Sequence, residues 1–435
     1  MHTFTNTEFT RSMKKTHTIY MPEMLHYHNE LLFAAFAVGG YKLAVVPEQE
    51  HICYETQSLV NKDYCTCAIG IIGNLLTFVK SDDCDREHIA FLEPQAGGAC
   101  RAGNYYNLII ECLHKLGYGQ IPVLSLNAHG LEQHSGFRIN GRMLLGAIAA
   151  VCYSDLLMDL TQQIRPYEKN AGETEGLRQQ WLQRLTEGIR HGRHLFYRKK
   201  VYREIVESFG RIPVDRGQAK KKVGVVGEIY IKCSPVGNRH LEDYLQKNGC
   251  DYRMGGFVNY CIYVVYSEMK SLELGHQSRL EAAGYQKVLQ FLYYVQKEIA
   301  EALEQAGFLH DRSFQELLAE KKDILSDYYN IGDGWLMTAE IIDLIKKGYD
   351  KILVVHPFGC LISHVGGRGV LKALHERFPE AKITSIEYDY GQSDTLRESR
   401  VLLAIEETLF RNPFAKPQFH RFPYAHVVIS PYQNK

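Results

Sequence analysis

The sequence predicts an α/β protein in which two doubly wound parallel sheets are joined by helical segments. Three observations predict this fold. Apolar, β-branched runs alternate with helical segments of about 10 to 15 residues near both ends of the chain, glycine follows many of those segments, and the middle of the chain is helical. We expect an N-terminal α/β domain over 16–150, a helical connector over 151–220, and a C-terminal α/β domain over 221–435 with a helical insertion at about 267–330.

The first domain is predicted from strands and helices that follow one another in order. Strands are expected at 18–21, 42–46, 88–92 and 121–126, and helices at 27–39, 69–80 and 105–116. The pair Gly39-Gly40 and the single Gly117 come directly after helical runs, where glycine commonly ends a helix. Helices between successive strands allow neighbouring strands to run parallel.

The rest of the chain repeats the alternation after a helical stretch at 143–211. The apolar run 223–231 is predicted to be a strand buried on both faces. The run 258–266 is either a strand or the start of a buried helix, because periodicity does not separate the two. The expected elements that follow are a helix at 277–306, a helix at 338–347, a strand at 351–355, a helix at 370–377, a strand at 382–386, a helix at 393–410 and a tail rich in Pro, Phe and Tyr.

Composition excludes several classes of protein. The 435 residues carry 50 Lys and Arg against 50 Asp and Glu, so the formal net charge is zero. That balance argues against a nucleic-acid-binding protein, which usually carries a basic excess. No run of about 18 consecutive apolar residues occurs, so we expect no membrane-spanning helix. The polar first 15 residues lack the features of a secretion signal, and we expect a cytoplasmic protein.

Eleven cysteines need an explanation in a reducing compartment, where structural disulfides are rare. Cys100 and Cys360 lie in loops directly after predicted strands, and Cys65 lies just before the helix expected at 69–80. Ligands of open α/β sheets bind at the carboxyl ends of strands. A cysteine at a helix start faces unpaired N–H groups and the positive end of the helix dipole, which favours the thiolate that binds iron. The simpler alternative is that these thiols are buried and inert.

Several segments resemble motifs of the 2-hydroxyacyl-CoA dehydratase-like proteins, in the branch associated with an ATP-dependent activase. They occur in the same order as in that family and span most of the chain. Segment 97–105 (GGACRAGNY) resembles G-G-x-C-R-x-x-N-Y, and 61–65 (NKDYC) resembles N-x-x-x-C. The other matching segments are 223–229 (VGVVGEI), 357–364 (PFGCLISH) and 389–393 (DYGQS).

The resemblance implies Rossmann-like domains with an iron-sulfur cluster between them, held by Cys65, Cys100 and Cys360. From the same motif, Gly98, Arg101 and Asn104 are expected to contact the cluster. Some single-chain relatives hold a double-cubane cluster, two [4Fe-4S] units joined by a sulfide, which needs about six thiolates. Cys67 is then the nearest candidate for a further ligand. The equally weighted alternative is that Cys67 packs in the core as a small apolar residue. The resemblance also implies a separate activase as the electron donor, and a homodimer.

Three functions remain open at this point. The main one is an ATP-dependent reductase of small molecules, whose low-potential cluster is charged by the activase. The second is an (R)-2-hydroxyacyl-CoA dehydratase, a lyase acting on a CoA thioester through a ketyl radical. The third is a non-catalytic electron carrier or cluster scaffold. ATP is not expected to bind to this chain, because it contains no G-x-x-x-x-G-K-[ST] phosphate loop.

Glu228 and a set of histidines are further candidate functional residues. Glu228, after the predicted strand at 223–231, is either a proton donor near the cluster or a helix cap. His26, His28, His129 and His134 are possible metal ligands, but among nineteen histidines they are more simply explained as surface or hydrogen-bonded core groups.

Overall fold

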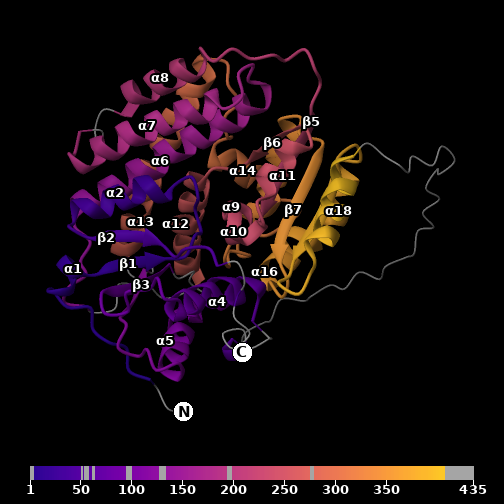
Figure 1. Ribbon diagram of the computed structural model, residues 1–435. Coiled ribbons are helices and arrows are strands. Elements are labelled where there is room, and N and C mark those ends of the chain that lie inside the picture. Colours follow the sequence, from indigo (N-terminus) through magenta and orange to yellow (C-terminus); the bar gives the residue numbers. More distant parts are fainter. Residues whose placement is uncertain are drawn as a thin grey trace. The chain divides into compact units, whose positions relative to one another are not determined.

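The computed structural model contains two four-stranded sheets in which every paired strand is parallel (Figure 1). It describes residues 4–49, 52, 58–60, 64–94, 100–126, 134–193, 198–274 and 279–406. The α/β class with two parallel sheets is therefore confirmed. Both sheets belong to one compact unit that ends at Ile405, and the domain boundaries expected at 150 and 220 stay predictions.

The first sheet has the strand order β2-β1-β3-β4. Its elements, in chain order, are α1 (Met13–Thr16), β1 (Thr18–Met21), α2 (Asn29–Val38), β2 (Lys42–Val45), α4 (Thr66–Lys80), β3 (Ile89–Pro94), η1 (Arg101–Asn104), α5 (Tyr105–Lys115) and β4 (Val123–Leu126). Alternate residues of β3 enter different cores: Phe91 packs with residues of α4 and α5, whereas Leu92 packs with Ile19 and Leu124. This alternation is the period-two pattern of a strand covered on both faces.

The second sheet has the equivalent order β6-β5-β7-β8. Its strands are β5 (Lys221–Gly227), β6 (Cys250–Met254), β7 (Lys351–Pro357) and β8 (Lys382–Tyr388), and its helices are α9 (Ile229–Cys233), α10 (Pro235–Asn238), α11 (Leu241–Lys247), α15 (Leu336–Lys346), α16 (Leu361–Ser363), η3 (His364–Gly369), α17 (Leu371–Arg377) and α18 (Asp394–Ile405). In each sheet the second strand pairs on one side of the first strand and the third strand pairs on its other side. This change of side, the topological switch point, lies between β1 and β3 in one sheet and between β5 and β7 in the other. Ligands of open α/β sheets bind outside the strand ends at such switch points.

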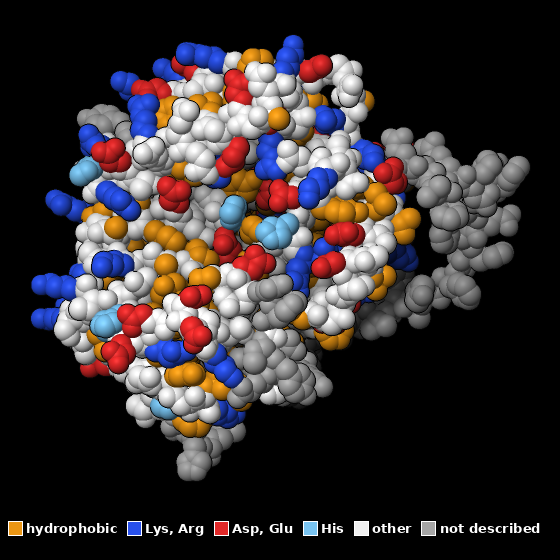
Figure 2. All heavy atoms as spheres, in the orientation of Figure 1, with side chains coloured by type: hydrophobic (Ala, Val, Ile, Leu, Met, Phe, Trp, Pro, Cys, Tyr) orange, Lys and Arg blue, Asp and Glu red, His pale blue; other side chains and the backbone are white. Residues whose placement is uncertain are grey.

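A group of helices forms a third core. It consists of α6 (Gly141–Ile164), α7 (Glu173–Arg190), α8 (Arg198–Phe209), α12 (Phe257–Leu274), α13 (Arg279–Gln305) and α14 (Phe314–Glu320), with the short η2 (Arg165–Tyr167) after α6. Leu156, Trp181, Phe209 and Trp335 are among the residues buried together there. On the face seen in Figure 2, acidic and basic side chains are interspersed, in keeping with the balanced charge.

The stretch Gly141–Tyr167 is long and apolar enough to cross a membrane, and it is the one such stretch among the described residues. However, 72% of its apolar window is buried inside the protein. It also carries Asp155 and Asp159, whose carboxylates are buried against other protein groups. Those features are typical of a core helix in a water-soluble protein.

Three expectations about secondary structure need correction or completion. The strand expected at 223–231 ends at Gly227, because Glu228 caps α9 and its side chain accepts a hydrogen bond from the Ile231 N–H at 3.0 Å. The ambiguous run 258–266 lies within helix α12. Strand β6 was not expected at all. The last helix is described to Ile405, and the rest of the stretch predicted at 393–410, with the tail, lies outside the described residues.

Candidate functional site

Each of the three predicted ligand cysteines lies at the start of a helical segment. Cys65 is the N-cap residue of α4, Cys100 is the N-cap residue of η1, and Cys360 follows β7 and is the N-cap residue of α16. Cys65 and Cys360 are each 8% exposed, and Cys100 is half-buried. All three cysteines therefore lie in the kind of segment predicted for them: Cys100 and Cys360 in loops after strands, and Cys65 at the start of a helix.

The Cys65 and Cys360 loops, which belong to different sheets, contact each other through their backbones. The Thr66 N–H donates a hydrogen bond to the Phe358 carbonyl at 3.0 Å. Between them, Gly359 has a φ of +76° and approaches so closely that an added Cβ would lie 3.4 Å from the Cys65 Cα. Only glycine adopts this left-handed conformation without strain, so Gly359 allows the two loops to meet.

Cys100 interacts electrostatically with residues near the point where the Cys65 and Cys360 loops meet. Burial raises the pKa of the Cys100 thiol to about 12, and negative charge on Glu228, Asp333 and Cys360 adds to the effect. The neighbouring Arg101 guanidinium would lie 3.9 Å from a Cβ added at Gly359. Residues from both sheets therefore gather around Glu228.

The thiols differ in how readily they ionise. A hydrogen bond with Cys67 lowers the pKa of Cys65 to about 6 against the opposing effect of burial, and Tyr105, whose hydroxyl lies 2.9 Å from the Cys65 Sγ, adds to the lowering. Burial raises the pKa of Cys360 to about 12 and places that of Cys67 well above its ordinary value. The pKa of Cys65 is therefore lowered mainly by its side-chain hydrogen bonds, and the Ala68 N–H at the helix start adds a smaller effect. The expectation that a helix start favours the thiolate is wrong for Cys100 and Cys360, because desolvation dominates there.

Two buried carboxyl groups complete the surroundings of the thiols. The Glu228 Oε2 accepts hydrogen bonds from the Cys67 Sγ at 3.2 Å and from the Ile231 N–H, so the capping alternative for Glu228 is confirmed. Burial raises the pKa of Asp333 to about 8, and the charge of Glu228 adds to this. Asp333 was not predicted from the sequence. The one local signal is its position between Gly332 and Gly334, which both have positive φ.

The structure describes two of the three predicted cofactor-contacting residues. Asn104 is exposed, and its side chain donates a hydrogen bond to the Tyr64 hydroxyl at 2.9 Å, which links the Cys100 and Cys65 loops. Arg101 is exposed on η1. Gly98 lies outside the described residues, as does His129. A direct role of Gly98, Arg101 and Asn104 in cofactor binding stays a prediction.

The histidines do not gather with the thiols into a metal site. His134 accepts a hydrogen bond from the Phe9 N–H at 3.0 Å, and the half-exposed His26 pairs with Glu23. In the part of the chain that the structure describes, no group of three or more His, Cys, Asp or Glu side chains is placed to hold one metal ion. An iron-sulfur cluster is wider than one ion, so its ligands lie further apart. Cysteine thiols on several loops form the donor set that such clusters use, and the residues present fit that group.

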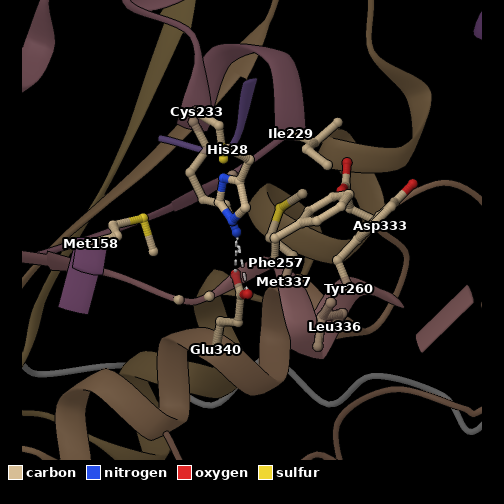
Figure 3. Close-up of a pocket in the computed structure, with 14 residues that line it drawn as sticks. His28, Met158, Ile229, Cys233, Phe257, Tyr260, Asp333, Leu336, Met337 and Glu340 are labelled. Atoms are coloured by element: carbon tan, nitrogen blue, oxygen red, sulfur yellow. Dashed lines mark hydrogen bonds and ion pairs between the residues drawn. The ribbon is translucent and has the colours of Figure 1, made fainter. Parts of the chain in front are cut away.

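A narrow pocket is lined by residues of α9, α12 and α15 and by the segments before them (Figure 3). Asp333 and Tyr260 line it, and both are electrostatically coupled to Cys100. Lys232 and Glu340 form a buried ion pair in its wall, with the Lys232 Nζ 3.2 Å from both carboxylate oxygens. A glycine pair, Gly255 and Gly256, forms another part of the wall.

Comparison with known proteins adds no further identification. No protein-family model matches the sequence, and a search of curated proteins finds no significant match.

Proposed function

We propose that this chain is an iron-sulfur enzyme that carries out reductive chemistry on a small molecule and receives its electrons from a separate ATP-dependent activase. Cys65, Cys100 and Cys360 would hold the cluster, with Cys67 as a candidate for a further ligand. The observation that carries the proposal is the meeting of the Cys65 and Cys360 loops across two sheets, with Cys100 coupled to the same spot. When bound, an iron-sulfur cluster supplies one-electron chemistry at low potential.

The residues around the thiols support reduction rather than simple storage of a cluster. Tyr105 contacts the Cys65 sulfur and Glu228 contacts the Cys67 sulfur, so both sulfurs are held in fixed positions. Hydrogen bonds to thiolate sulfurs are among the means by which proteins tune cluster potentials. Cys360 likewise accepts from the Ser363 hydroxyl at 3.2 Å.

The pocket favours an enzyme over an electron carrier. An electron carrier needs no ligand cavity beside its cluster, whereas the pocket here is lined by carboxyl, amine and imidazole groups. Its volume of about 10 Å³ offers room for about one water molecule. A small molecule therefore suits this pocket better than a bulky one.

Anaerobic purification tests the proposal directly. The protein is expected to be brown, to contain iron and acid-labile sulfide, and to bleach in air. Replacement of Cys65, Cys100 or Cys360 by Ser is expected to remove cluster iron. Cys152→Ser is the matched control, because Cys152 is buried in the helical core. Full iron content in the Cys100→Ser protein would refute the ligand assignment.

A further inference from the structure

His28 and Asp155 form a buried pair in which one imidazole nitrogen is left unused. The His28 Nε2 lies 2.7 Å from the Asp155 Oδ1, and the two side chains are 3% and 8% exposed. His28 directly precedes α2, and Asp155 lies in the middle of α6. The other nitrogen, Nδ1, is buried and has no hydrogen-bond partner within the described structure. An unused nitrogen on a buried histidine is unusual, because buried polar groups are normally hydrogen-bonded.

The surroundings of Asp155 fix which imidazole nitrogen carries the hydrogen. Asp155 accepts hydrogen bonds from the Phe257 N–H at 2.8 Å and the Val258 N–H at 2.7 Å, at the start of α12. The backbone comes so close that a Cβ on Gly256 would lie 2.6 Å from the Asp155 Oδ2. A carboxylate held by two N–H donors acts as an acceptor toward His28. The His28 Nε2 therefore donates, and Nδ1 is the nitrogen free to take up or release a proton.

His28 lines the same pocket as Asp333 and Tyr260 (Figure 3). Its ring also packs edge-on against Phe257, with ring centroids 5.5 Å apart. The titratable and charged groups that face this space or contact the His28 ring are Asp155, Lys232, Cys233, Tyr260, Asp333 and Glu340. Lys232 and Glu340 neutralise each other as an ion pair. The pocket thus combines a small volume with a wall histidine whose Nδ1 has no hydrogen-bond partner among the described residues.

We propose that His28 is the proton-transfer residue of this pocket and that Asp155 is its positioning residue. The ligand is a molecule of one or two heavy atoms with an oxygen or nitrogen lone pair. In the transfer, the Nδ1–H bond of the His28 imidazolium breaks and a new bond to hydrogen forms on the ligand's lone pair. His28 becomes neutral and regains a proton from water. Which reaction uses this proton transfer depends on the proposed function. The His28–Asp155 pair and the binding of a ligand beside it do not depend on that function.

The first experiment uses the full-length chain without metal. Histidine labelled with ¹⁵N reports by NMR which ring nitrogen carries the hydrogen, and His28→Gln identifies the His28 signals. We expect neutral His28 to be protonated at Nε2, the nitrogen that faces Asp155. Methanol, used as a small hydroxyl probe, is expected to shift the Nδ1 signal of His28 in a saturable way. A hydrogen on Nδ1 in the neutral form, or no shift with methanol, overturns the proposal.

The second experiment uses the iron-loaded protein and compares His28→Gln with His26→Gln. His26 is the matched control, because it lies two residues away with its side chain 49% exposed. In the parent protein and in His26→Gln, the midpoint potential is expected to fall with rising pH. In His28→Gln that dependence is expected to vanish while iron content is retained. An unchanged pH dependence in His28→Gln overturns the proposal, whereas absence of iron in the parent protein refutes only the proposed function.

Discussion

The Cys67 thiol donates a hydrogen bond to the Glu228 carboxylate, with the Sγ 3.2 Å from the Oε2. The contact joins α4, which covers the first sheet, to the residue that directly follows β5 of the second sheet. Cys67 also forms a hydrogen bond with the Cys65 thiol, and this bond is the main cause of the lowered pKa of Cys65. Cys67 thus lies between a predicted cluster ligand and a buried carboxyl group.

Replacement of Cys67 decides between ligation and packing. The hydrogen bond between the two thiols means that both sulfurs face the same space, so we expect Cys67 to be a ligand. Cys67→Ala is then expected to lose about half or all of the iron per chain, measured by iron quantification and the visible spectrum.

Cys67→Ser and Cys112→Ala serve as comparisons. A serine hydroxyl can still donate to Glu228 but is a poor substitute for a thiolate, so equal iron loss in the Ser and Ala proteins would point to ligation rather than to the hydrogen bond. Cys112 is a buried thiol on α5 and is expected to be dispensable for iron. Unchanged iron and an unchanged spectrum in Cys67→Ala would leave Cys67 as a packed apolar residue.

The alternation of strands and helices was predictable because each strand carries an apolar run that is visible locally. Strand β6 was not, because its sequence contains Asp251 and Arg253. Arg253 is fully buried, with its Nη2 2.7 Å from the Asp159 Oδ1 on α6. A charged residue becomes acceptable in a buried strand when a distant partner neutralises it, and that partner is not evident from nearby sequence.

In the candidate site, too, features set by neighbouring residues could be predicted from the sequence, whereas contacts between distant segments could not. The position of Cys360 directly after a strand could be predicted from the sequence. The backbone contact between Thr66 and Phe358 could not, because it depends on how two sheets pack. The pairing of His28 with Asp155, 127 residues apart, is likewise set by the packing of α2 against α6. Local motifs therefore indicate which residues reach the site, and packing decides what each of them contacts.

Light scattering under anaerobic conditions is expected to show a homodimer of about 100 kDa, twice the 49.9 kDa of one chain. The reason is the resemblance to dehydratases that pair two homologous cluster-bearing subunits. Here two-fold symmetry can replace such a pair, and it is the commonest arrangement of oligomers. A mass of one chain at working concentration would contradict this prediction.

ATP is expected to act through the activase and not through this chain. The sequence contains no Walker-type loop to hold phosphates. Isothermal titration of ATP into the purified protein is therefore expected to give no saturable heat. Reduction of the loaded protein is expected to require both the activase and ATP. Tight ATP binding by this chain alone would show that the two roles are not divided.

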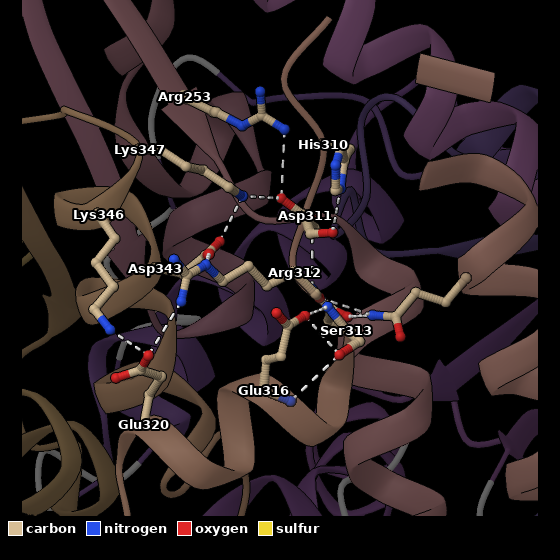
Figure 4. A network of polar contacts seen from close by, with 12 residues as sticks. Arg253, His310, Asp311, Arg312, Ser313, Glu316, Glu320, Asp343, Lys346 and Lys347 are labelled. Carbon is tan, nitrogen blue, oxygen red and sulfur yellow. Dashed lines mark hydrogen bonds and ion pairs between the residues drawn. The ribbon is translucent and has the colours of Figure 1, made fainter. Parts of the chain in front are cut away.

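Asp311 is expected to contribute strongly to stability through a buried network of charges (Figure 4). Its Oδ1 lies 2.8 Å from the Lys347 Nζ and 3.4 Å from the Arg253 Nη2, and its Oδ2 accepts from the Gly256 N–H at 3.1 Å. Burial alone would raise the pKa of Asp311, but Lys347 and Arg253 hold it well below its ordinary range. Asp311→Asn removes one carboxylate partner from each cation, while Arg253 still contacts Asp159 and Lys347 still contacts Asp343. The substitution is therefore expected to lower the free energy of unfolding by about 2 kcal/mol.

The sign of the pH dependence follows from the lowered pKa. The contribution of Asp311 is fully present above the pKa of an unfolded aspartate, about 4, and is lost as pH falls toward the lower pKa of the folded state. Urea unfolding at pH 7 and at about pH 3.5 is therefore expected to show a smaller difference between the parent protein and Asp311→Asn at the acidic pH. Asp323→Asn, at an exposed position, is the control and is expected to change stability by less than about 0.5 kcal/mol. An Asp311→Asn protein as stable as the parent at pH 7 would show that the network adds nothing to stability.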